Sequence, residues 1–218
     1  AIFPDLVYAA NTPSNTLRFA DGTYSILGEF GSYQTSNRLA KCKYYEVYVD
    51  KAALTIAGST RLYPTLIVGN NAVHHERIFR FNVRNNSLLT TTNSFYVYRS
   101  TNSIVRIENS KWVALGADVR DSLAIGIGFA GDDYFYATTS RLVAVNSEIE
   151  TGREHPKGHF YFGREEYNYK KITKGDAYMT NCNIKCNAMF AFIASDSILK
   201  DCTFTGHSTG TDYSFVVS

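Results

Sequence analysis

The feature that most constrains the fold is a short motif repeated near the end of the chain. Asn181-Cys182-Asn183-Ile184 returns as Asp201-Cys202-Thr203-Phe204, so that the two cysteines lie 20 residues apart. In both copies an Asn or Asp is followed by a small residue, a polar residue and a large apolar residue. This alternation is typical of a β-strand with one buried face. The period is too short for helical-hairpin repeats of roughly 33 to 47 residues and suits one coil of a parallel β-solenoid.

The same motif can be followed back through the chain at longer intervals. Earlier copies are Asn86-Ser87-Leu88-Leu89, Asn109-Ser110-Lys111-Trp112 and Asn146-Ser147-Glu148-Ile149. From copy to copy the small residues are separated by 23, 37, 35 and 20 residues. Because most connections are only about 4 to 6 residues long, the two long intervals indicate coils that carry insertions of roughly 15 residues. These insertions, 116–136 and 152–174, are expected to lie side by side on one flank of the solenoid.

The motif also predicts which residues stack on one another in successive coils. The small residues are expected to form one column and the large apolar residues a second. The first column is Ser110, Ser147, Cys182 and Cys202, and the second is Trp112, Ile149, Ile184 and Phe204. Asparagines such as Asn86, Asn93, Asn102 and Asn109 are expected at the corners, because Asn tolerates the left-handed backbone that a tight corner requires. Sugar binding by the same amides is the less favoured interpretation.

Composition narrows the class of protein without naming a function. The chain of 218 residues is 44% hydrophobic and carries 16 Tyr and 14 Phe, which favours a folded chain rich in strands. Its formal charge of +2 argues against a nucleic-acid surface, and no apolar run predicts membrane insertion. We expect an irregular lead-in at 1–16 and one domain at 17–218. The four cysteines are interpreted as small buried residues, and no metal or cofactor is predicted.

Two segments near the start of the chain resemble a known family. The stretch LRFADGTYSI at 17–26 is similar to the opening coil of the pectate-lyase-like right-handed parallel β-helix superfamily, and residues 53–58 and 65–69 look like its second coil. The resemblance implies an all-β fold, a right-handed parallel β-helix with two flanking loop insertions. Gly131-Asp132-Asp133 and Gly158-His159 also resemble two short motifs of polygalacturonase-like hydrolases, although Phe160 stands where that family has a second Gly.

The two insertions hold the residues that we predict to form a carbohydrate site. Aromatic faces bind sugar rings, and Arg binds acidic groups on a glycan. The predicted substrate-binding residues are His159, Tyr161, Arg164, Tyr167 and Tyr169. Glycoside hydrolysis needs two carboxylates that flank the bond, and the candidates are Asp132, Asp133, Glu165 and Glu166. A lyase reaction based on His159, Tyr161 and Arg164, and a solvated hairpin with no catalytic role, remain alternatives.

Among β-helix proteins, the chain most resembles a bacteriophage tailspike or tail fibre domain. It lacks clear lyase motifs and ends within an apolar alternation, without a polar capping coil. The resemblance implies a homotrimer on a virion that binds, and in some members depolymerises, bacterial surface polysaccharide. A secreted, monomeric polysaccharide lyase or glycoside hydrolase is the second hypothesis. A purely structural solenoid is the third.

Overall fold

The part of the chain that the computed structural model describes is all-β. The described residues are 15–27, 44–57, 60–62, 78–98, 103–116, 123–129, 139–151, 158–162, 164–166, 171–186, 189–192, 196–206 and 214–217. They form strands β1 to β21 and contain no helix, so the prediction of an all-β chain is confirmed. Within these ranges there is no helical segment with the length and hydropathy needed to cross a membrane.

The strands are grouped in three sheets, named A, B and C. Sheet A consists of β1 (Asn15–Ala20), β3 (Tyr44–Asp50), β6 (Ile78–Arg84), β9 (Ser103–Glu108), β12 (Thr139–Val145), β16 (Lys171–Thr180), β15 (Arg164–Glu166) and β19 (Ile198–Lys200). Sheet B consists of β2 (Thr23–Ile26), β4 (Ala53–Ile56), β7 (Leu88–Thr91), β10 (Lys111–Ala114), β13 (Glu148–Thr151), β17 (Asn183–Cys186) and β20 (Thr203–Gly206). Sheet C consists of β5 (Thr60–Leu62), β8 (Phe95–Tyr98), β11 (Leu123–Phe129), β14 (His159–Phe162), β18 (Met189–Phe192) and β21 (Ser214–Val217). Among the described strands, β15 and β16 alone pair in antiparallel fashion, and all other pairs are parallel.

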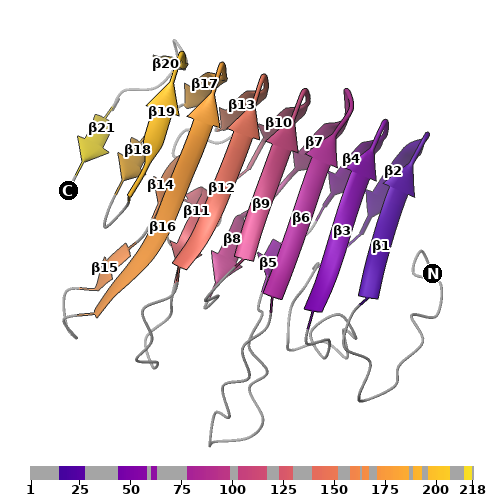
Figure 1. The fold of residues 1–218 in the computed structure, drawn as a ribbon, viewed down its shortest axis with the longest axis horizontal. Helices are drawn as coiled ribbons and strands as arrows, with labels where there is room; N and C mark the ends of the chain where they lie inside the picture. Colours follow the sequence, from indigo (N-terminus) through magenta and orange to yellow (C-terminus); the bar gives the residue numbers. More distant parts are fainter. Residues whose placement is uncertain are drawn as a thin grey trace, which may run out of the picture.

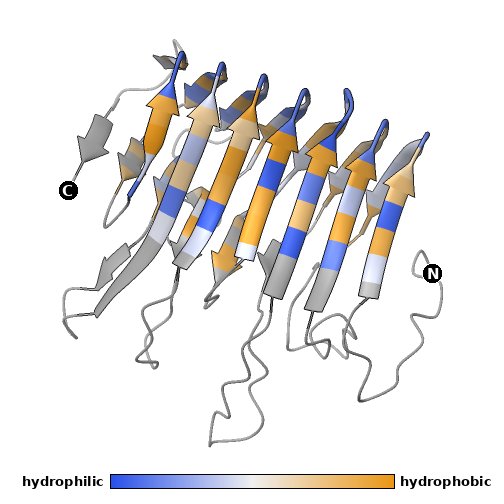
Figure 2. Ribbon diagram, viewed as in Figure 1, coloured by the Kyte–Doolittle hydropathy of each residue, from blue (hydrophilic) through white to orange (hydrophobic). Residues whose placement is uncertain are grey.

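The chain visits the three sheets in turn. β6, β7 and β8 lie in sheets A, B and C, and β9, β10 and β11 follow the same order one position further along the stack (Figure 1). Each such set of three strands is called a repeat below. Figure 2 shows hydrophilic and hydrophobic residues alternating along β1, β3 and β6, as expected for strands with one face in a core. Parallel sheets connected in this order are compatible with the expected β-helix.

The predicted column of large apolar residues is confirmed by the register of sheet B. Trp112 pairs with Ile149, Ile149 with Ile184, and Ile184 with Phe204. On the other side Trp112 pairs with Leu89, which extends the column. Trp112 and Ile149 have no exposed surface and Ile184 is 1% exposed, whereas Phe204 in the last described strand of sheet B is 36% exposed. Burial of a side chain in this column therefore depends on having a neighbouring repeat on both sides.

The column of small residues is held by hydrogen bonds between repeats. The Ser147 hydroxyl accepts a hydrogen bond from the Ser110 backbone N–H at 3.2 Å, and the Ser110 hydroxyl accepts one from the Ser87 N–H at 3.1 Å. The Ser147 hydroxyl also donates to the Val145 carbonyl at 2.7 Å. Cys182 takes the next place in the column, with its Sγ 3.3 Å from the carbonyl two residues before it. A small side chain is required here because it must reach two backbone groups at once.

Replacing Ser147 with Ala is expected to lower the free energy of unfolding by about 1–3 kcal/mol, because the buried Ser110 N–H loses its acceptor. Ser147→Cys is expected to cost less, since Cys182 already occupies the equivalent place in the next repeat. Urea unfolding of both variants checks the expectation. An alanine variant as stable as the parent would show that this hydrogen bond contributes nothing.

Each connection from sheet A to sheet B turns through a left-handed residue. The residues with positive φ, apart from glycine, are Asp21, Lys51, Asn85, Asn86, Asn109, Asn146, Asn181 and Asp201. An L-residue in this region costs roughly 1–2 kcal/mol, and Asn and Asp tolerate it best because their side chains hydrogen-bond locally. The prediction of left-handed asparagine corners is thus confirmed at Asn86 and Asn109, whereas Asn93, between β7 and β8, has no positive φ. Asn102 lies outside the described residues.

The described parts of the two predicted insertions are strands, which corrects their interpretation as loops. β11 lies within 116–136 and β14 within 152–174, and both belong to sheet C. β11 carries buried Ala124, Ile125 and Ile127 in the core. The alternation in this glycine-rich stretch is therefore that of a core strand, because a third sheet must close each repeat.

Candidate functional site

The structure places the predicted carbohydrate site only in part. Asp132, Asp133, Tyr167 and Tyr169 lie outside the described residues. Arg164, Glu165 and Glu166 form β15, whose backbone pairs with Thr173, Ile172 and Lys171 of β16. β15 therefore lies on the sheet A side of the stack, whereas β14 lies in sheet C.

His159 and Tyr161 are the two predicted binding residues whose side chains are described. Both lie on β14, are partly exposed, and meet edge to face with ring centroids 5.7 Å apart. β14 pairs with β11, so strands from the two predicted segments are direct neighbours. Tyr161 stands opposite Gly126 on one side and Ala191 on the other. An aromatic pair on this face of sheet C is suited to contact with a sugar ring.

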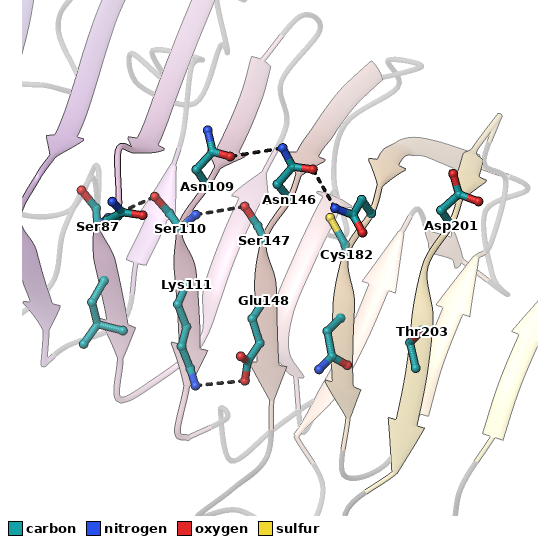
Figure 3. Close-up of a pocket in the computed structure, with 14 residues that line it drawn as sticks. Ser87, Asn109, Ser110, Lys111, Asn146, Ser147, Glu148, Cys182, Asp201 and Thr203 are labelled. Carbon is teal, nitrogen blue, oxygen red and sulfur yellow. Dashed lines mark hydrogen bonds and ion pairs between the residues drawn. The ribbon is translucent and has the colours of Figure 1, made fainter.

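A groove lined mostly by polar residues, here called the corner groove, follows the connections between sheets A and B. It has a volume of about 830 Å³ and crosses the repeats that contain β7, β10, β13, β17 and β20 (Figure 3). Its lining residues are Asn86, Ser87, Leu88, Asn109, Ser110, Lys111, Asn146, Ser147, Glu148, Asn181, Cys182, Asn183, Asp201 and Thr203. Figure 2 shows that these corners are hydrophilic. The groove runs across the strands, along the direction in which the repeats stack.

One wall of the corner groove is a ladder of asparagine amides. Asn181 Nδ2 donates to Asn146 Oδ1 at 2.9 Å, and Asn146 Nδ2 donates to Asn109 Oδ1 at 3.2 Å (Figure 3). All three residues are exposed. An amide group has two hydrogens and two lone pairs, so each rung keeps hydrogen-bonding capacity for a ligand. The left-handed corners fix the backbone below these amides and hold the ladder at a constant spacing.

The opposite wall is formed by the first residue of each sheet B strand. Lys111 Nζ lies 2.9 Å from Glu148 Oε1, and Lys185 Nζ lies 3.5 Å from the same oxygen. The hydrogen bond from Lys111 is the largest of the effects that hold the pKa of Glu148 below its ordinary range, so Glu148 is ionised at neutral pH. Asn183 and Thr203 continue this wall as exposed neutral groups.

The floor of the corner groove is the column of small residues. Their hydroxyls are buried and already bonded to backbone groups, so they are not free to bind a ligand. Burial raises the pKa of the Cys182 thiol, against a hydrogen bond from the Ser147 backbone that lowers it. A thiol held in its neutral form is a poor nucleophile. The floor therefore has a structural role.

The outer face of sheet A carries charges that are satisfied among themselves. Arg18 and Arg84 lie over the Tyr48 ring at 5.3 and 4.8 Å from its centroid. Asp50 accepts hydrogen bonds from Asn85 at 2.7 Å and from Arg84 at 2.9 Å, and these bonds lower the pKa of its carboxyl group. Because the arginines and the ring cover one another, this face is less suited than the corner groove to bind a ligand.

One residue of the amide wall, Asn109, was predicted from the sequence as a corner residue, with sugar binding as the second interpretation. Asn146 and Asn181 were recognised only as the first residues of motif copies, and the groove itself was not predicted. The opposite wall was missed because its residues have no shared chemistry: Leu88, Lys111, Glu148, Asn183 and Thr203. Their common signal is position, since each follows the small residue of the motif.

Metal-ligand groups and related proteins also bear on the identity of the site. Within the described ranges, no group of three His, Cys, Asp or Glu side chains is arranged to hold a metal ion. No protein-family model, no curated protein and no solved structure matches the chain.

Proposed function

We propose that the chain is a right-handed parallel β-helix that binds bacterial surface polysaccharide as a bacteriophage tailspike or tail fibre domain. The three-sheet order of the strands supports a β-helix. Right-handedness follows from the strong preference of crossovers between parallel strands for that hand. The resemblance of residues 17–26 to the pectate-lyase-like superfamily supports the same fold.

The corner groove is the observation that carries the proposal of polysaccharide binding. It is open and elongated, and it presents amide, hydroxyl and carboxylate groups over five successive repeats. Parallel strands lie roughly 4.8 Å apart, so similar groups recur at short, regular steps along the groove. A polymer of repeating sugar units can place a hydroxyl at each step.

We test the proposal by removing the two exposed neutral groups of one wall, in the double variant Asn183→Ala/Thr203→Ala. Neither side chain takes part in a described hydrogen bond, so the fold is expected to remain intact. A net hydrogen bond is worth about 0.5–1.5 kcal/mol, so the loss of two should weaken polysaccharide binding by the double variant roughly 5- to 150-fold. Calorimetric titration with purified capsule and lipopolysaccharide glycans measures the effect.

Thr205→Ala is the matched control for this experiment. Thr205 is an exposed threonine on the same strand, β20, but it does not line the corner groove. It should bind like the parent. Equal binding by the double variant and the parent would remove the corner groove from the proposal. The complete absence of glycan binding by the parent would favour the purely structural solenoid, and release of reducing ends would show that the chain is an enzyme.

We propose in addition that the domain is a homotrimer, as the resemblance to tailspikes implies. The support lies in the last described repeat, where Ile198 is 62% and Phe204 36% exposed. Apolar surface of this kind is often covered in an assembly. Light scattering should give three times the chain mass of 24.4 kDa. A monomer at micromolar concentration would contradict the trimer and favour a secreted enzyme.

A further inference from the structure

The charges of the corner groove restrict the glycan that it can hold. Among its lining residues the charged side chains are Lys111, Glu148 and Asp201, which sum to one negative charge. Lys111 is the cation of this set, and its Nζ lies 2.9 Å from Glu148 Oε1 and 4.0 Å from Glu150 Oε2. An acidic sugar could therefore bind Lys111 only by competing with carboxylates that already contact it. It would also be repelled by Asp201, the lining carboxylate at the β20 end of the groove.

We infer that the corner groove selects an uncharged glycan chain and discriminates against acidic ones; this inference rests on the proposed function. The amide ladder fits this ligand, because a sugar hydroxyl both donates and accepts, and an amide offers a donor and an acceptor in one plane. Asn183 and Thr203 add neutral groups on the other wall. The sequence-based expectation that Arg164 binds acidic groups of a glycan applies to β15, which does not line the corner groove.

The geometry of the corner groove also determines the direction in which the glycan lies and the length of glycan that fills the groove. The lined strands β7 to β20 are separated by four steps of about 4.8 Å, so the groove is roughly 19 Å long. The glycan runs along this length, across the strands. No aromatic side chain is among the lining residues, and Leu88 supplies the exposed apolar contact, at the end nearest β7. Binding therefore depends on many hydrogen bonds in series, and affinity grows with chain length until the groove is filled.

The test uses pairs of polysaccharides that differ only in charge. An array carries uronic-acid-containing bacterial capsule polysaccharides beside the same polymers after carboxyl reduction with carbodiimide and borohydride. The parent protein should bind the reduced, uncharged polymers at least tenfold more tightly. Binding should change little with ionic strength, because attraction between opposite charges does not contribute. Glu148→Gln, which frees Lys111 from its closest partner, should narrow the preference for uncharged chains.

The outcomes separate this inference from the proposed function. If the acidic polymers bind more tightly, and Asn183→Ala/Thr203→Ala weakens them while Thr205→Ala does not, the groove binds glycans but the charge selectivity is wrong. If reduced and acidic polymers bind equally, the selectivity is also wrong. If the parent binds no member of the array, or if the double variant binds as the parent does, the proposed site fails and the inference fails with it. Reduced oligosaccharides of two to eight units should show the rise in affinity with length.

Discussion

Ile184→Asp is expected to destabilise the fold by at least about 4 kcal/mol. Ile184 is 1% exposed and lies in register between Ile149 and Phe204. Truncating a buried Ile alone costs roughly 2–5 kcal/mol. The substituted carboxyl group would have to be buried either charged and unpaired or protonated, and both add to the cost. For a chain of this size the loss corresponds to a fall in Tm of roughly 8–16 °C or more.

Asn183→Asp is the control for Ile184→Asp, because it adds the same charge one residue earlier on the same strand. Asn183 is exposed and faces solvent. The Tm of the Asn183→Asp protein should therefore stay within roughly 2 °C of that of the parent, as is usual for surface substitutions. Both variants can be followed by circular dichroism during heating. An Ile184→Asp protein that melts with the parent would show that this residue does not face the core.

The motif at Asn181 and Asp201 predicted the stacking of sheet B because burial fixes strand register. A slip of one residue would turn every apolar residue of the motif to solvent, so a single alternation suffices to align Trp112, Ile149 and Ile184. The corners were predictable for a related reason. A left-handed residue is required there, and few residue types tolerate it.

Sheet C was predicted poorly because its strands lack a repeated motif. β11 has glycines at alternate positions, 126 and 128, and it falls within 116–136, which the long interval between motif copies indicated to be an insertion on the flank of the solenoid. In the structure these glycines belong to a strand whose other face carries Ile125 and Ile127 into the core. A short apolar run does not by itself distinguish a core strand from a covering loop.

The corner groove could not be predicted from the sequence because it belongs to no segment. Asn109 and Asn181 are 72 residues apart, yet only Asn146 separates them in the ladder. The same holds for Lys111 and Glu148, which become neighbours through the pairing of β10 with β13. Only the stacking of repeats creates the surface. By contrast, the charged and aromatic residues of 152–174 are close together in the sequence, and the predicted binding residues were therefore chosen from that one segment.

Trp112→Ala is the second variant with a large expected effect, about 3–5 kcal/mol. Trp112 is fully buried in sheet B and meets Phe95 of sheet C edge to face, with ring centroids 4.6 Å apart. Phe95 in turn meets Phe81 of sheet A at 5.4 Å. The indole therefore belongs to an aromatic cluster where all three sheets meet. Its removal leaves a cavity that strands hydrogen-bonded on both sides cannot readily close.

A conservative pair of variants separates the loss of volume from the loss of a hydrogen bond at this position. Trp112 Nε1 donates to Thr91 Oγ1 at 3.1 Å, and both atoms are buried. Thr91→Val leaves the indole N–H unpaired and should cost about 1–3 kcal/mol. Trp112→Phe removes the donor. In a Trp112→Phe background, Thr91→Val should therefore lower the free energy of unfolding by less than it does in the parent protein. Trp112 is the single tryptophan of the chain, so unfolding must be followed by circular dichroism in urea. If the two changes are additive, the hydrogen bond contributes nothing, and the stability of the cluster comes from packing alone.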